Sequence, residues 1–250
     1  MNGDERYLFD LQGFLVVEDA LDASQLTALN EILDRRIEDE VAADDHTHRF
    51  LDLLAWGKPY QDLVDNPRIT DYLTELIGDP LRLDHVYLDI IRSGKGPIGT
   101  SLHGGATPLH PTHYYRHRNH TMRNGLFVVA YNLYDVNPGD GGFAAVPGSH
   151  KSNYAFPSHW KELDGSQDLP FVAKVTGRAG TAILFTEAMT HGTLPWHGRE
   201  RRTIFYKYSP PAVSWSNRYF NAADYPTMTE RQKAMLAPPS ALASPFLNGA

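Results

Sequence analysis

The chain has 250 residues, of which 42% are hydrophobic and 11% aromatic, so it can bury one substantial core, and we predict a single domain over residues 1–250. The net charge of −7 argues against a nucleic-acid polymer or an anionic membrane as partner. The absence of cysteine excludes disulfides and thiolate metal sites, so a metal would have to be bound by His, Asp or Glu.

Two amphipathic helices are predicted within a helical region that spans residues 20–80. The first covers 22–40, because apolar residues recur there at steps of three and four after the start Asp22-Ala23-Ser24, which offers N-cap candidates. The second covers 67–77, and its cap, first-turn and end residues are Asn66, Pro67 and Gly78. No apolar run reaches the ~18 residues of a membrane span, and the first residues lack a signal-peptide pattern, so we expect a cytoplasmic protein.

Beyond residue 80 the pattern changes to short runs rich in Val, Ile, Tyr and Phe, separated by turns rich in Gly and Pro. Strands are predicted at 14–18, 81–93, 126–136, 142–147, 171–175, 181–187 and 203–210. Helices followed by such strands predict a mainly β fold with flanking helices, in which residues 81–210 form an antiparallel barrel or jelly roll. We expect residues 211–250 to form a loop, a short helix that Thr227 and Glu230 open as a capping box, and a loosely ordered end.

A histidine and an arginine stand before the last predicted strand. His191 follows the strand 181–187, and Arg202 opens the strand 203–210, so both side chains are expected near one mouth of the barrel. Imidazole is a good ligand for Fe(II), and the arginine fork binds a carboxylate through two hydrogen bonds. A 2-oxo acid that chelates iron and is held at its far end by the arginine would meet both groups.

Three motifs in the chain resemble the phytanoyl-CoA dioxygenase family of Fe(II)/2-oxoglutarate oxygenases. They are the turn segment 138–143 that leads to the Pro-Gly-Ser-His run at 147–150, the Thr-His-Gly run at 190–192, and the spacing between His191 and Arg202. The resemblance covers roughly residues 10–210. It implies a double-stranded β-helix, a cupin-like jelly roll, and this agrees with the strand pattern.

The same resemblance implies an iron site that binds 2-oxoglutarate. It makes His103 and His191 the imidazole ligands and Arg202 the anchor of the far carboxylate of 2-oxoglutarate. Asn132 is a polar residue within an apolar strand, and period-two alternation sends it to the face opposite Tyr131, so we expect it to contact 2-oxoglutarate.

Gly105 occupies the position of the family's metal-binding aspartate. A glycine there removes a side chain and a negative charge, and in this the chain is similar to non-haem iron halogenases, in which chloride binds iron at the vacant position. Alternatively, Gly104 and Gly105 allow a tight loop while Asp140 or Glu187 supplies the carboxylate. Asp140 lies in a predicted turn, so a structural role is the simpler interpretation for it, as for His150. Glu187 lies four residues before His191, so its simpler role is to support the metal ligands without binding the metal.

The segment 110–120 follows His103 and is dense in His, Arg and Tyr. It is either a solvated loop or a substrate lid whose basic groups bind phosphate or carboxylate. The substrate-binding candidates in and beside it are His110, His113, Arg116, Arg118 and Arg123.

Together these features predict a halogenase of secondary metabolism, for example in antibiotic biosynthesis, that uses Fe(II), 2-oxoglutarate, O2 and chloride to chlorinate an unactivated C–H bond of a small molecule. The basic and aromatic segment favours a phosphate-bearing substrate with a flat ring, such as a nucleotide. The alternative is a hydroxylase of the same family, in which water or a distant carboxylate completes the iron site. A jelly-roll binding protein without metal is the rival from a different class.

Overall fold

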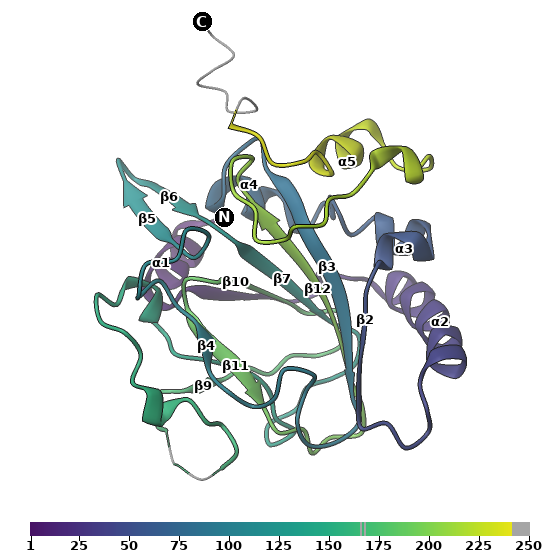
Figure 1. Ribbon diagram of the computed structural model, residues 1–250, viewed down its shortest axis with the longest axis horizontal. Coiled ribbons are helices and arrows are strands. Elements are labelled where there is room, and N and C mark those ends of the chain that lie inside the picture. Colours follow the sequence, from purple (N-terminus) through teal and green to yellow (C-terminus); the bar gives the residue numbers. More distant parts are fainter. Residues whose placement is uncertain (166, 168, 242–250) are drawn as a thin grey trace, which may run out of the picture.

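The computed structural model describes residues 1–165, 167 and 169–241 and shows two antiparallel sheets that enclose a common interior (Figure 1). The six-stranded sheet has the order β1-β10-β7-β12-β3-β2, and the four-stranded sheet has the order β4-β11-β8-β9. The strands of the large sheet are Phe14–Val17, Ala182–Thr186, Phe127–Asn132, Arg201–Ser209, Arg82–Ile91 and Thr47–Phe50. Those of the small sheet are His103–Gly104, Thr190–Leu194, Gly142–Ala145 and Ala173–Lys174. The mainly β jelly-roll prediction is therefore confirmed.

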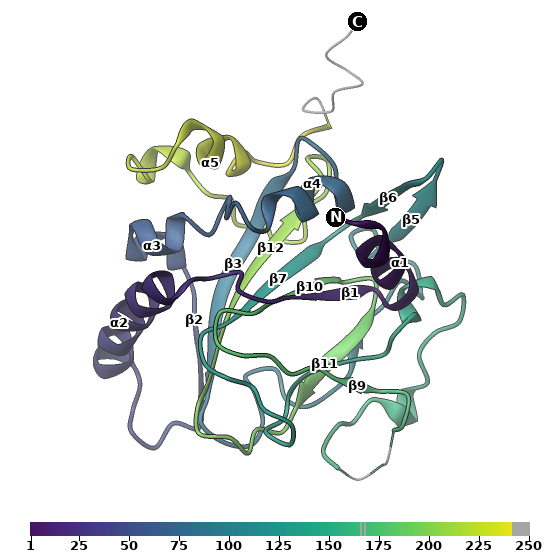
Figure 2. The same cartoon turned by 180° about the vertical axis from the view of Figure 1, so that it is seen from behind.

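The two faces of the large sheet differ because side chains alternate along each strand. On β12, Ile204 and Tyr206 belong to an outer core that includes residues of α1 (Gly3–Gln12), α2 (Ala23–Glu40), α3 (Lys58–Gln61), α4 (Thr70–Leu76) and α5 (Glu230–Met235). Phe205 belongs to an inner core that it shares with Phe143 of the opposite sheet. In Figure 2 the helices α2, α3 and α4 lie along one side of the sheets.

The predicted helices are present, with two changes in where they begin. α2 starts at Ala23 with Asp22 as its cap, as expected. α4 starts at Thr70, three residues later than predicted, because the Asn66 carboxamide oxygen accepts from the amide of Arg68 and closes a turn first. The cap of α5 is Thr229 rather than Thr227, since the Thr227 hydroxyl donates to Gln61 instead.

Several short elements were not predicted from hydropathy, and they include α1, α3, β2, β4, β11 and the hairpin strands β5 and β6. The helix α1 precedes β1, and a separate hairpin of β5 (Tyr115–Arg118) and β6 (Thr121–Asn124) projects from the molecule in Figure 1. The hairpin turns at Asn119 and His120, whose φ values of 51° and 59° match the left-handed conformations of a type I′ turn. Among the described residues, no helix is long and apolar enough to cross a membrane, and residues 242–250 of the predicted loose end lie outside them.

Candidate active site

Two histidines meet across adjacent strands of the small sheet. His191 on β11 is the register partner of His103 on β4, and their ring centroids are 4.5 Å apart. The Nδ1 atom of His103 bonds the carbonyl of Ser101 at 3.0 Å, and Nδ1 of His191 bonds that of Met189 at 2.8 Å. A carbonyl only accepts, so each Nδ1 carries the proton and each Nε2 keeps its lone pair. Imidazoles oriented in this way by backbone carbonyls fit a pair of metal ligands.

An ion pair lies directly beside His191. Glu187 follows β10, and one of its carboxylate oxygens is 2.6 Å from Nζ of Lys207 on the inner face of β12. Its other oxygen is 3.7 Å from Nε2 of His191 and 4.0 Å from Nε2 of His113. Glu187 is buried, with a side-chain exposure of 5%, and Lys207 is largely buried, with an exposure of 14%.

Burial and charge set the protonation of this cluster. Burial alone would raise the pKa of Glu187, but Lys207 and His191 hold that pKa well below its usual range. Burial, aided by the nearby His103, lowers the pKa of His191 to about 3 although Glu187 acts in the opposite direction. The Glu187 carboxylate raises the pKa of Lys207 against its burial. At neutral pH the cluster therefore holds a neutral imidazole, a carboxylate and an ammonium group.

Gly105 lies next to this cluster and offers no ligand. Its φ is +97°, and its amide donates to the carbonyl oxygen of Glu187 at 3.0 Å. A Cβ at this position would meet the hydroxyl of Thr190 at 3.3 Å, a tight contact, and no other described atom outside its chain neighbours within 4 Å. Among the described residues, no group of three or more His, Cys, Asp or Glu side chains is arranged to hold a metal. Asp140 lies in the turn, where its carboxylate accepts from the amide of Asn137.

Polar atoms without partners gather on the inner face of the large sheet. Thr203 lies on β12 beside Asn132 of β7 and Asp89 of β3 in the strand register. Asn132 Nδ2 and Oδ1, Thr203 Oγ1, Arg201 Nε and Trp196 Nε1 are all buried without a hydrogen-bond partner among the described residues. Asp89 is paired with Arg49 at 2.6 Å. Buried polar atoms of this kind are costly unless a ligand binds them. All except the acceptor Asn132 Oδ1 are able to donate, and these donors suit a carboxylate.

Arg201 carries the charge of this inner group. Burial lowers the pKa of Arg201 to about 10, against the opposing effect of Asp89 and Tyr87. The side chain is still a cation at neutral pH, and its buried fork could pair with an incoming carboxylate.

The structure does not bring Arg202 to this interior, so that prediction is wrong. Strand β12 begins at Arg201, and alternation turns Arg202 to the outer face. There its guanidinium contacts Asp34 of α2 at 2.7 Å and Glu200 at 2.7 Å, and it lies over the ring of Tyr134. Asn132, in contrast, faces the interior while Tyr131 faces the helices, as alternation predicted.

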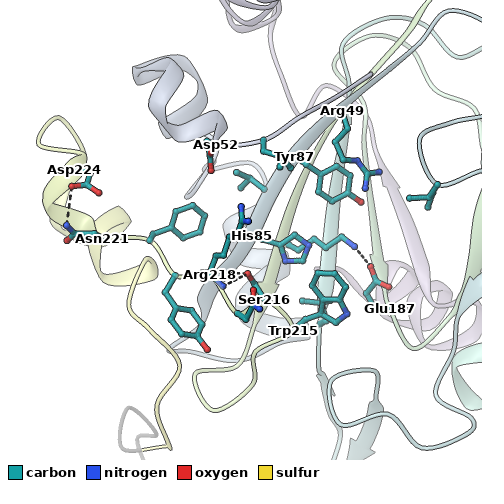
Figure 3. Close-up of a pocket in the computed structure, with 18 of the residues that line it drawn as sticks. Arg49, Asp52, His85, Tyr87, Glu187, Trp215, Ser216, Arg218, Asn221 and Asp224 are labelled. Carbon is teal, nitrogen blue, oxygen red and sulfur yellow. Dashed lines mark hydrogen bonds and ion pairs between the residues drawn. The ribbon is translucent and has the colours of Figure 1, made fainter. Parts of the chain in front are cut away.

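A cavity of about 860 Å³ opens beside His103, and Figure 3 shows Glu187 and Trp215 among the residues that line it. Its inner wall carries His103, His113, Glu187 and Lys207, and its outer wall is formed by the segment 215–225. Trp215 stacks on His85 with a centroid distance of 4.9 Å, and Arg218 lies on the same wall. The volume is in the range of about 300–1,000 Å³ that is typical of small-molecule sites. The segment after Ser214 thus forms part of the cavity.

The substrate-binding candidates are divided by the hairpin β5–β6. His113 lines the cavity, and His110 stacks on it with ring centroids 4.0 Å apart. Arg116, Arg118 and Arg123 lie on the hairpin, are exposed and do not line the cavity. The type I′ turn keeps these three arginines on a projecting arm, which agrees with the solvated alternative for them.

Several residues at the site were not predicted from the sequence. Lys207 stands within the aromatic run 204–208, and a lysine in a buried strand is a signal that could have been used. Arg201 was missed because the strand was predicted to start at 203, which leaves the facing of both arginines undefined. The wall residues Trp215 and Arg218 lie in a loop with no periodicity. His150 packs on α1, where its Nε2 bonds the Asp10 carbonyl, in agreement with a structural role.

Comparisons with known proteins agree with this fold. A profile described as phytanoyl-CoA dioxygenase matches residues 9–204. HygX from Streptomyces hygroscopicus, solved with nickel and 2-oxoglutarate bound, is 22% identical with a TM-score of 0.75, over 86% of this chain and 90% of that chain. The HygX structure with iron bound has a TM-score of 0.74 at 22% identity, with the same coverage. SnoN, an α-ketoglutarate-dependent epimerase from nogalamycin biosynthesis, is 19% identical with a TM-score of 0.58, over 83% of this chain and 82% of that chain. No curated protein sequence gives a significant match.

Proposed function

The chain belongs to the phytanoyl-CoA dioxygenase family of Fe(II)/2-oxoglutarate-dependent oxidoreductases, and from this premise we propose that it is a halogenase of secondary metabolism. One observation carries the proposal. His103 and His191 present two free Nε2 atoms side by side, while the nearby carboxylate of Glu187 is paired with Lys207 and position 105 is glycine. A metal bound by only two side chains keeps room for an extra anion.

Different residues of the site would bind the metal and the far carboxylate of 2-oxoglutarate. His103 and His191 would hold Fe(II), and Arg201 with Asn132 and Thr203 would hold the far carboxylate of 2-oxoglutarate. When bound, iron, 2-oxoglutarate and O2 supply the oxidising chemistry that breaks a C–H bond, and chloride supplies the atom that replaces the hydrogen. The aromatic inner core around Phe143 and Phe205 excludes water from this interior.

The substrate would bind in the cavity that the segment 215–225 closes. We propose a phosphate- or carboxylate-bearing molecule with a flat ring, such as a nucleotide. Trp215 is 57% exposed and offers a ring face for stacking, while Arg218 supplies positive charge on the same cavity. A substrate held by this wall lies on the open side of His103.

Product mass spectrometry tests the proposal. The protein is supplied with Fe(II), 2-oxoglutarate, O2 and chloride, and nucleoside monophosphates form the first substrate panel. We expect a product with the isotope pair of chlorine, which disappears when sulfate replaces chloride. A product that gains one oxygen in the presence of chloride contradicts halogenation.

Gly105→Asp provides the matching variant. The new carboxylate would compete with chloride for iron, so we expect chlorination to be suppressed, at a stability cost of about 1–2 kcal/mol for a non-glycine residue at positive φ. Gly139→Asp is the control, because Gly139 has nearly the same φ of +94° and nothing near its Cβ, in an exposed turn. Chlorination that persists in Gly105→Asp as in the control would count against this role of Gly105.

A hydroxylase of the same family is the second candidate. The observation that favours it is the distance of 3.7 Å between Glu187 Oε2 and His191 Nε2, which would let Glu187 approach a metal on that histidine. The two candidates thus differ in what Glu187 does.

A further inference from the structure

Glu187 is within reach of a metal bound to His191. Two ligand atoms that each lie about 2.1 Å from one metal ion are separated by at most about 4.2 Å. Glu187 Oε2 and His191 Nε2 are 3.7 Å apart, so distance alone does not keep the carboxylate from the metal. The site therefore contains a possible third ligand even though position 105 is glycine.

Lys207 competes with the metal for that carboxylate. Its ammonium lies 2.6 Å from Oε1 of Glu187, and both groups are buried where water screens their attraction poorly. Lys207 reaches Glu187 because it lies on the inner face of β12, two residues beyond Phe205. A strand position fixes the ammonium more firmly than a loop would, so the pair is held in one geometry.

We propose that Lys207 is a positioning residue that keeps the Glu187 carboxylate out of the coordination sphere of the iron, and so keeps a position free for a halide ion. This inference rests on the proposed function. Lys207 also neutralises the negative charge of Glu187. Without Lys207, this carboxylate would repel an anion bound at the metal a few ångströms away. One lysine thereby removes a competing ligand and a repelling charge.

The test uses Co(II) as the metal probe in the full chain with 2-oxoglutarate, under anaerobic conditions. Co(II) affinity is measured by titration, and the visible absorption of the bound ion reports its coordination. Lys207→Met keeps the volume of the side chain but frees Glu187, Glu187→Gln removes the carboxylate, and the double variant removes both charges. The double variant leaves no unpaired buried charge, so it is expected to fold even where a single variant does not.

The inference predicts different Co(II) affinities for the two single variants. Lys207→Met should bind Co(II) at least roughly tenfold more tightly than the double variant, with a changed visible spectrum, because Glu187 then becomes a ligand. The double variant and Glu187→Gln should stay within about threefold of the wild type, well below the 10–100-fold loss expected when a coordinating group or its support is removed. A tenfold loss of Co(II) affinity in the double variant would show that Glu187 is already a ligand and would overturn the inference. Equal affinities of Lys207→Met and the double variant would also overturn it.

A chloride titration separates this inference from the proposed function. If chloride leaves the spectrum of wild-type Co(II) protein unchanged while the variants behave as expected, the halogenase proposal fails and the role of Lys207 stands. If chloride changes the wild-type spectrum but Lys207→Met shows no added ligand, the role of Lys207 fails and the halogenase proposal stands.

Discussion

The two faces of the large sheet differ in their polar groups near the start of β12, where Arg201 and Arg202 lie. On the outer face, Arg202 is paired with Asp34 and Glu200, and the hydroxyl groups of Tyr206 and Tyr208 donate to backbone carbonyls of the helical layer. On the inner face, Arg201, Thr203 and Asn132 each retain buried polar atoms that find no partner in the described part of the chain. The satisfied Arg202 and the unsatisfied Arg201 are adjacent residues of β12, so the difference arises from the face on which each side chain lies.

Satisfied groups on the outer face contribute to stability, because their desolvation is offset within the protein. Unsatisfied groups on the inner face cost stability and persist where a ligand is to be bound. The comparison therefore assigns binding to Arg201 and structure to Arg202, although the two arginines are adjacent in sequence. Variants of each face can break or sharpen this assignment.

The arginine pair gives the largest expected contrast. Arg201→Gln should weaken 2-oxoglutarate binding by about 100-fold, because a buried charged partner of the carboxylate is lost. Arg202→Gln should leave 2-oxoglutarate affinity unchanged and lower the free energy of unfolding by about 1–3 kcal/mol. Titration of 2-oxoglutarate into the metal-loaded protein and urea unfolding of both variants check this. The reverse pattern would assign the anchor to Arg202.

The next largest expected effect is a pH dependence of the free energy of unfolding. It arises from His150, which packs on α1 outside the inner face. Burial lowers the pKa of His150 to about 4 from the ordinary value of 6.5. Between these values the unfolded chain binds a proton that the folded protein does not, so stability is lost as the pH falls from about 6.5 to 4. This loss amounts to about 3 kcal/mol at most.

His150→Gln should keep a donor for the Asp10 carbonyl and remove this part of the pH dependence. Urea unfolding of both proteins between pH 7 and pH 4.5 measures the difference. Parallel curves for the two proteins would mean that His150 does not titrate in this way.

Asn132→Leu has the smallest expected effect. It tests how far the unsatisfied polar atoms of the inner face lower the free energy of unfolding. The change removes two unsatisfied buried atoms while nearly keeping the volume, so the free energy of unfolding without ligand should rise by about 1 kcal/mol. The affinity for 2-oxoglutarate should fall roughly tenfold for the lost hydrogen bonds. Tyr131→Phe on the outer face is the control, with no change in affinity. A destabilised Asn132→Leu with normal 2-oxoglutarate binding would mean that Asn132 is structural.

How much of this was predictable depends on the kind of signal. The longer strands, the helix α2 and the opposite facing of Tyr131 and Asn132 follow from local periodicity, which the structure reproduces. The short strands β4 and β11, which carry His103 and His191, were not predicted. The facing of Arg201 and Arg202 could not be predicted, because an error of two residues at a strand end leaves alternation without a fixed starting point. The Glu187–Lys207 pair joins residues of different strands, and no local pattern encodes such a contact. The cavity wall at Trp215 depends on where a loop folds back, which periodicity does not describe.

A structure of the protein with Fe(II), 2-oxoglutarate and chloride, prepared without O2, tests the central claim most directly. We predict iron bound by Nε2 of His103 and His191, a halide ion at the position that an aspartate at 105 would fill, and Glu187 still paired with Lys207. An oxygen of Glu187 bonded to iron, with no halide beside it, would contradict the account.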